Sequence, residues 1–154
     1  MRLEVEDFGF EGVMRSVRAI GDRAQDMRVP FNWIATDFER IMASNFASEG
    51  QYSGPMWRPL TFKWQMHKID VGKDHGILQY NRDLVRSLTV RHAKGSVRTI
   101  RRDEMILGTR IPYARFHTTG TEHMPRRNFM RIPVWDRRRW VKAIEHYIMT
   151  GSMT

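Results

Sequence analysis

The sequence predicts an α+β fold in which a small antiparallel β-sheet is packed by N-terminal and C-terminal helices. Apolar residues recur at three- and four-residue steps towards both ends of the chain, which is the pattern of amphipathic helices. Shorter alternating segments lie between them and are typical of strands. Helical and strand segments are segregated along the chain, which favours an α+β fold over alternating βαβ units.

Size and composition indicate one globular domain over residues 1–154. The chain has 154 residues, with 41% hydrophobic and 28% charged residues. Cysteine is absent, which excludes disulfides, thiolate metal sites and cysteine nucleophiles. No apolar run approaches the ~20 residues that cross a bilayer, and the acidic start does not suit a secretory signal. We expect a soluble protein without a membrane partner.

The first third predicts a short strand over residues 2–8 and a helical part over residues 10–49. Pro30 is expected to divide the helical part into two helices. The apolar stripe of the first helix comprises Val13, Val17, Ile20, Ala24 and Met27, and that of the second comprises Phe31, Ile34, Phe38, Ile41, Met42 and Phe46. Both stripes are interpreted as core packing.

Irregular structure and a short helix follow. Two glycines, two prolines and a serine predict a loop over residues 49–59. Residues 61–73 suit a short helix. Leu88 and Val90 alternate with polar residues, which predicts a strand over residues 84–92.

The last third predicts a hairpin and a C-terminal helix. A β-hairpin that turns near Arg101-Arg102-Asp103 is indicated by Val97 and Ile100, followed by Met105 and Leu107. Residues 112–120 suit one or two helical turns, and residues 129–132 suit a closing strand. A helix over residues 133–149, opened by its proline, and a loose tail over residues 150–154 complete the chain.

Positive charge is concentrated after residue 50. Residues 1–50 contain 6 Lys and Arg against 9 Asp and Glu, whereas residues 51–154 contain 20 against 8. Of the 26 cations, 21 are Arg, whose fork binds phosphate or carboxylate at two points. The split suits nearby nucleic acid, an acidic protein face, or a solvated basic surface.

No pattern of catalytic or metal-binding residues stands out. A phosphate-binding loop and a Gly-x-Ser-x-Gly motif are missing, and the six histidines lack ligand spacing. We therefore predict no enzymatic activity, no metal and no cofactor. The helical part over residues 10–49 is net acidic, so any DNA contact is expected at the phosphate backbone, without sequence recognition.

Four short motifs follow one another between residues 57 and 133. These motifs supply an indole that can bury a large area, glycines that suit tight turns, and a tyrosine and a histidine that share one helix face. They are interpreted first as residues that maintain the fold. The motifs are Trp57-Arg58-Pro59-Leu60, Leu84-Val85-Arg86-Ser87, Gly108-Thr109 with Tyr113-Ala114-Arg115-Phe116-His117-Thr118-Thr119-Gly120, and Pro125-Arg126-Arg127-Asn128-Phe129.

In this order, the motifs resemble the tail-completion (virion morphogenesis) and neck, or head–tail connector, proteins of tailed bacteriophages. The resemblance implies a structural virion protein that forms a homo-oligomeric ring, such as a hexamer, and joins the tail to the head connector. It implies contacts with a head-closure or connector protein and with a tail terminator or tail tube protein. The expected location is the neck of the virion, after assembly in the host cytoplasm.

Four arginines are the candidates for a subunit interface or a lumen that faces packaged DNA: Arg115, Arg126, Arg127 and Arg131. The hypothesis is that the acidic N-terminal helices of one subunit meet the Arg-rich part of the next. The alternative function is a basic accessory protein that binds the backbone of nucleic acid without sequence recognition.

Overall fold

The computed structural model describes residues 10–153, which form six helices and one two-stranded antiparallel sheet. The predicted α+β class is confirmed. The predicted strand over residues 2–8 lies outside the described residues. In chain order, the elements are α1 Phe10–Gln25, α2 Arg28–Ala47, α3 Phe62–Asp70, α4 Asp83–Thr89, β1 Ser96–Ile100, β2 Met105–Thr109, α5 Ala114–Thr119 and α6 Val134–Thr150.

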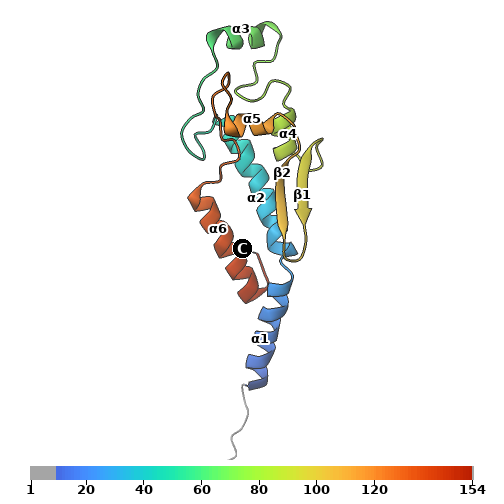
Figure 1. Cartoon of the computed structure of the whole chain (residues 1–154). Helices are drawn as coiled ribbons and strands as arrows, with labels where there is room; N and C mark the ends of the chain where they lie inside the picture. Colours follow the sequence, from blue (N-terminus) through green and yellow to red (C-terminus); the bar gives the residue numbers. More distant parts are fainter. Residues whose placement is uncertain (1–9, 154) are drawn as a thin grey trace, which may run out of the picture.

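Helix α2 is the centre of the core. In Figure 1 it runs through the middle of the molecule, with α6 on one side and α4 and the hairpin on the other. Its second apolar stripe is buried as predicted, through Ile34, Phe38, Ile41, Met42 and Phe46. These side chains pack against residues from α4, α5 and the long connections. Burial of this stripe supplies the main driving force for folding.

The break between the first two helices comes earlier than predicted. Helix α1 ends at Gln25 and α2 begins at Arg28, so Pro30 lies in the first turn of α2 and does not separate the helices. A first-turn proline is tolerated because the N–H that it lacks has no partner within the helix. The junction is instead held by the Met27 amide, which donates to the carbonyl oxygen of Arg102 at 2.7 Å.

The predicted strand over residues 84–92 is wrong, because Asp83–Thr89 forms helix α4. Leu84, Val85 and Leu88 are buried on the side that packs against α2. This spacing fits a helix better than a strand, whose alternate side chains face opposite sides. The alternation of Leu88 and Val90 is therefore a coincidence at the end of the helix.

The predicted closing strand over residues 129–132 is also wrong, since that segment is irregular. The buried Asn45 amide donates to the carbonyl oxygen of Arg131 at 2.9 Å and to that of Phe129 at 3.4 Å. A side chain of α2 thus takes the place that a neighbouring strand would fill. Phe129 is fully buried against Phe46 with ring centroids 6.1 Å apart.

The other predicted elements are confirmed. β1 and β2 pair from Ser96 with Thr109 to Ile100 with Met105, and the turn closes where the Arg101 amide donates to the Glu104 carbonyl oxygen. The short helices α3 and α5 and the C-terminal helix α6 lie within one to three residues of their predicted positions. Helix α6 continues to Thr150, into the segment predicted as a loose tail.

The molecule is elongated, with α3 at one end and α1 at the other (Figure 1). Helix α1 contacts the body through its last turns. Arg23 Nε donates to the carbonyl oxygen of Ile148 at 2.7 Å, and Nη2 donates to that of Met149 at 2.9 Å. Because the last carbonyls of a helix lack partners within it, this arginine caps the end of α6.

Candidate assembly surfaces

The first and last sequence motifs build the core. Trp57 is buried and meets the edge of Phe46, with ring centroids 5.5 Å apart. Leu60 packs against the same core, and Phe129 lies on its other side. Pro59 lies beside Leu60, and Pro125 is half-buried near the last motif. These residues hold the two long connections against α2.

The second motif and β2 are joined by a hydroxyl pair. Ser87 Oγ lies 2.7 Å from the carbonyl oxygen of Leu84 and 2.7 Å from Thr109 Oγ1. Leu84 is fully buried under α2. Gly108 lies inside β2, paired with Val97, and not at a tight turn as expected. The motif residues therefore fasten α4 to the sheet.

The Tyr113–Gly120 segment forms α5 and its ends. Tyr113 stands before the helix and meets the ring of His117 edge-on, with centroids 5.8 Å apart, and Ala114 is buried. Gly120 ends the helix at φ 79°, where a Cβ would come 3.1 Å from the Arg126 amide nitrogen. Glycine is required at this turn because other residues are strained at positive φ and would meet that backbone.

His117 lies in the interior of this segment. The pKa of His117 is below its ordinary value because burial disfavours the imidazolium, and the guanidinium of Arg127 repels it as well. Its Nδ1 is buried without a hydrogen-bond partner among the described residues. The side chain is therefore held in its neutral form at neutral pH.

The four candidate arginines do not share one environment. Arg115, Arg126 and Arg131 are exposed. Arg127 is only 6% exposed, and its guanidinium donates to the carbonyl oxygen of Arg58 at 2.9 Å and to that of Pro59 at 3.3 Å. Within the subunit, Arg127 joins the first motif to the last.

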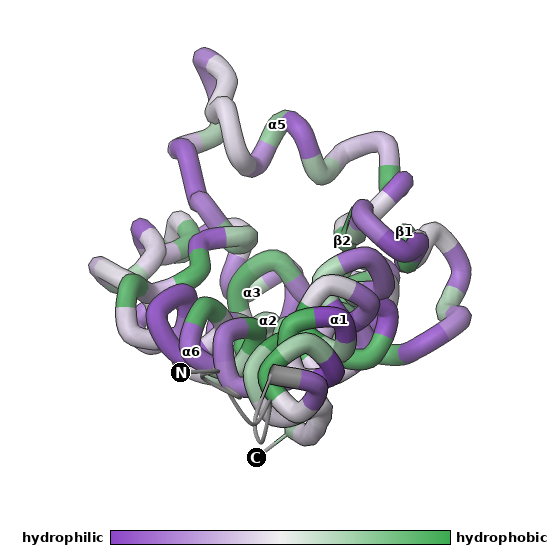
Figure 2. Tube along the Cα trace, turned by 90° about the horizontal axis from the view of Figure 1, so that it is seen from below, coloured by the Kyte–Doolittle hydropathy of each residue, from purple (hydrophilic) through white to green (hydrophobic). Residues whose placement is uncertain are grey.

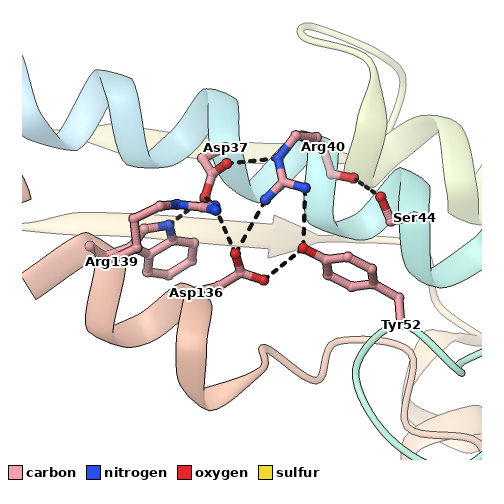
Figure 3. Close-up of polar contacts among 7 residues, drawn as sticks. Asp37, Arg40, Ser44, Tyr52, Asp136 and Arg139 are labelled. Carbon is pink, nitrogen blue, oxygen red and sulfur yellow. Dashed lines mark hydrogen bonds and ion pairs between the residues drawn. The ribbon is translucent and has the colours of Figure 1, made fainter. Parts of the chain in front are cut away.

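A polar network joins α2, the loop after it and α6 (Figure 3). Asp136 is completely buried and receives bonds from Arg40 at 3.3 Å, Arg139 at 2.7 Å and the Tyr52 hydroxyl at 2.9 Å. Asp37 binds Arg40 at 2.8 Å, and it also accepts from Arg139 and the Trp140 indole. Burial alone would raise the pKa of Asp37, but these hydrogen bonds outweigh it and lower that pKa.

Sequence reasoning missed this network. Asp37 and Arg40 lie outside the apolar stripe of their helix, and Asp136 belongs to none of the four motifs. A signal was nevertheless present, because Asp136 and Arg139 are three residues apart in a helix and so share a face with Trp140 close by.

Apolar side chains are exposed at both ends of the molecule. The α1 face comprises Val13, Met14 and Val17, with Val13 59% and Val17 56% exposed. The first stripe is thus not core packing over this part, contrary to the prediction. The α3 face comprises Phe62, Met66 and Ile69, with Phe62 79% exposed. Figure 2 looks along α1 and shows apolar and polar residues on its different sides.

A cavity of about 870 Å³ lies between α3 and the α5 segment. Trp64 and Lys68 line it from α3, on the side opposite the α3 face. Tyr113 and His117 line it from the other wall. In Figure 2 the α5 segment stands away from α1, α2 and α6. The cavity borders the main core through Leu60 and Leu78, and it was not predicted.

The N-terminal helices are less acidic than the hypothesis of an acidic helical surface requires. Residues 10–50 contain 5 Arg against 6 Asp and Glu, so α1 and α2 are together almost neutral. Asp37 and Glu39 are paired with arginines of the same chain. The remaining acidic excess lies in residues 1–9, which have three acids and one Arg.

Residues 10–153 contain no membrane-spanning helix and no cluster of metal-binding side chains. No helix among them is long and apolar enough to span a bilayer. No group of three or more His, Cys, Asp or Glu residues gathers there in a way that would hold a metal ion.

The comparisons with known proteins agree with the motifs. The model of the phage virion morphogenesis family matches residues 9–147, which is most of the chain. Neither a curated protein nor a solved structure matches. The matched range covers every described helix and strand except the last turn of α6. The chain is therefore a member of the phage virion morphogenesis family, which indicates a structural or assembly role in a bacteriophage virion.

Proposed function

We propose that the chain forms a homo-oligomeric ring at the head-proximal end of a phage tail and joins the tail to the head connector. Membership of the virion morphogenesis family is the observation that carries this proposal. A closed ring needs two different complementary surfaces on each subunit. The α1 face and the α3 face supply two exposed apolar surfaces at opposite ends of the molecule.

The neighbours in this proposal are a head-closure or connector protein on one side and a tail terminator or tail tube protein on the other. Exposed apolar residues of this extent suit protein contacts better than contact with water. Quantitative mass spectrometry of purified virions tests the location and the copy number. A fixed, ring-like number of copies supports the proposal, and absence from intact virions contradicts it.

The exposed arginines allow a sharper test of assembly. The double variant Arg115→Glu with Arg126→Glu should remain folded, because both side chains are exposed. It should reduce the yield of infectious particles if these arginines face a neighbour or the DNA. The control is Arg91→Glu with Lys94→Glu, which changes the net charge equally. Equal yields from the two variants would contradict a specific role for Arg115 and Arg126.

The alternative function is backbone binding to nucleic acid, and the excess of cations after residue 50 favours it. A salt titration of duplex DNA binding separates the two functions. Phosphate contacts lose affinity steeply as salt rises, whereas a ring subunit is expected to bind free duplex only weakly. Tight, salt-sensitive duplex binding without incorporation into virions would favour the alternative.

A further inference from the structure

The cavity between α3 and α5 has the walls of a peptide-binding site. Pro59, Leu60 and Tyr113 line it, together with Trp64 and Tyr80, which stack with ring centroids 5.8 Å apart. The two rings form an aromatic wall. A second contact joins α3 to the loop that carries Tyr80, because Lys68 Nζ donates to the carbonyl oxygen of Gly76 at 2.5 Å. Aromatic and proline side chains supply contact area at a low cost in conformational entropy.

The same cavity is positively charged. Arg58, Lys68 and Arg127 line it, and Glu122 is the sole carboxylate among the lining residues. None of these three cations forms an ion pair with a carboxylate among residues 10–153. Lys68 and Arg127 are almost fully buried and bind backbone carbonyls, whereas Arg58 is exposed. The pKa of Arg127 is lowered by burial and by repulsion from Arg58, while Glu49 partly offsets this. An occupant with carboxylates would relieve this repulsion.

Residues 1–9 have the matching chemistry. Their sequence is Met-Arg-Leu-Glu-Val-Glu-Asp-Phe-Gly, in which Glu4, Glu6 and Asp7 outnumber one Arg. Leu3, Val5 and Phe8 stand between or beside the acids. The segment therefore offers apolar side chains to an aromatic wall and carboxylates to the exposed Arg58, beside the buried Lys68 and Arg127.

The segment cannot reach the cavity of its own chain. Helix α1 begins at the opposite end of the molecule from α3 and α5 (Figure 1). Helices α1 and α2, of 16 and 20 residues, are about 24 and 30 Å long and follow one another along the molecule. Nine extended residues span at most about 30 Å, which is less than the two helices together. The cavity that residues 1–9 can enter belongs to another copy.

We propose that residues 1–9 of one copy bind in the cavity between α3 and α5 of a second copy. This contact is heterologous, because the donor and acceptor surfaces differ, and so it suits a ring or a stack of subunits. It rests on the proposed function only in requiring that the chain associates with itself.

The direct test is binding of a fluorescently labelled peptide of residues 1–9 to the full chain, measured by anisotropy. We expect saturable binding that weakens by about tenfold or more when the peptide carries Glu4→Gln, Glu6→Gln and Asp7→Asn, because the cations lose their partners. Arg58→Glu in the protein should weaken it similarly, and Trp64→Ala should remove the aromatic wall. Arg137→Glu, an exposed change on α6, is the matched control and should leave binding unchanged.

A charge exchange tests the contact in the assembled protein. Glu4→Arg with Glu6→Arg, or Arg58→Glu alone, should each reduce self-association in analytical ultracentrifugation, and the chain with all three changes should regain it. Unchanged self-association in the single-sided variants would overturn the proposal. So would a peptide that fails to bind, or one that binds Arg58→Glu and Arg137→Glu equally well.

Failure of this proposal and failure of the proposed function are distinguishable. If the chain is present in virions in fixed copy number but the peptide does not bind, the ring stands and this contact is overturned. If the peptide binds and the charge exchange restores association but virions lack the chain, the contact stands and the location is overturned. Binding of duplex DNA that depends on Arg58 at physiological salt, with no binding of the peptide, would assign the cavity to nucleic acid and overturn the proposal.

Discussion

Arg127 shows how a charged residue is used inside this subunit. It is nearly buried, its side chain donates to the carbonyl oxygens of Arg58 and Pro59, and its amide donates to the carbonyl oxygen of His117 at 2.7 Å. The segments at residues 58–59 and 117 therefore meet at Arg127, through its guanidinium and its backbone amide respectively. The neighbouring Arg126 is exposed.

The pair Arg126 and Arg127 gives a prediction about stability. Arg127→Ala should lower the free energy of unfolding by about 2–3 kcal/mol, because charge-assisted hydrogen bonds are lost and two carbonyls are left without partners. Arg126→Ala is the control and should change it by less than about 0.5 kcal/mol. Urea denaturation measures both values. Equal effects would show that the bonds of Arg127 contribute nothing to stability.

His117 gives a prediction about pH. Its pKa in the folded protein is below the ordinary value of 6.5, because burial and Arg127 disfavour the imidazolium. The unfolded chain therefore binds the proton more readily, and the contribution of His117 to stability is present above pH 6.5 and lost as the pH falls below it.

The variant His117→Gln isolates this contribution. The difference in unfolding free energy between the wild type and the variant should shrink as the pH falls from neutral towards acid. Thermal or urea unfolding at a series of pH values measures it. A difference that is constant with pH would contradict the lowered pKa.

At the scale of elements, Asp136 fixes the position of α6 against α2. It is fully buried and accepts from Arg40, Arg139 and Tyr52. Asp136→Ala should lower the free energy of unfolding by about 3 kcal/mol, because two arginines and a tyrosine lose their common acceptor. Chemical denaturation measures the change. Glu145→Ala, on the exposed side of α6, is the control, and a similar loss there would contradict the role of the network.

The sequence predicts an element correctly when its apolar pattern extends over many residues, and it fails when the pattern covers only a few. The stripe of α2 extends over many residues, so its period is clear. At the end of the seven-residue helix α4, Leu88 and the following Val90 imitate strand alternation. In residues 129–132, the competing partner is the Asn45 side chain, which lies more than eighty residues away and leaves no local trace.

The candidate site was predictable only in part, for a similar reason. The sequence places Arg126 and Arg127 side by side and cannot separate the exposed arginine from the buried one. Likewise, Val13 and Val17 stand in a stripe that predicts packing, and burial in a core or at an interface gives the same pattern. The cavity depends on two segments brought together by the fold.

At the scale of the whole molecule, α1 extends from the body with its α1 face exposed. Val13→Glu with Val17→Glu should leave the melting temperature of the dilute subunit within about 2 °C of the wild type, because neither side chain is buried. The same change should reduce oligomer formation in analytical ultracentrifugation. Arg15→Glu with Arg18→Glu, on the polar side of α1, is the control. Unchanged association in the valine variant would exclude the α1 face from the interface.

The cap that Arg23 places on the end of α6 links residues 125 positions apart in the chain. During translation, the first helix is complete long before its acceptor carbonyls have been synthesised. Its attachment to the rest of the subunit must therefore wait until the last helix has left the ribosome. Chains that lack the last helix therefore lose this cap and hold the first helix less firmly.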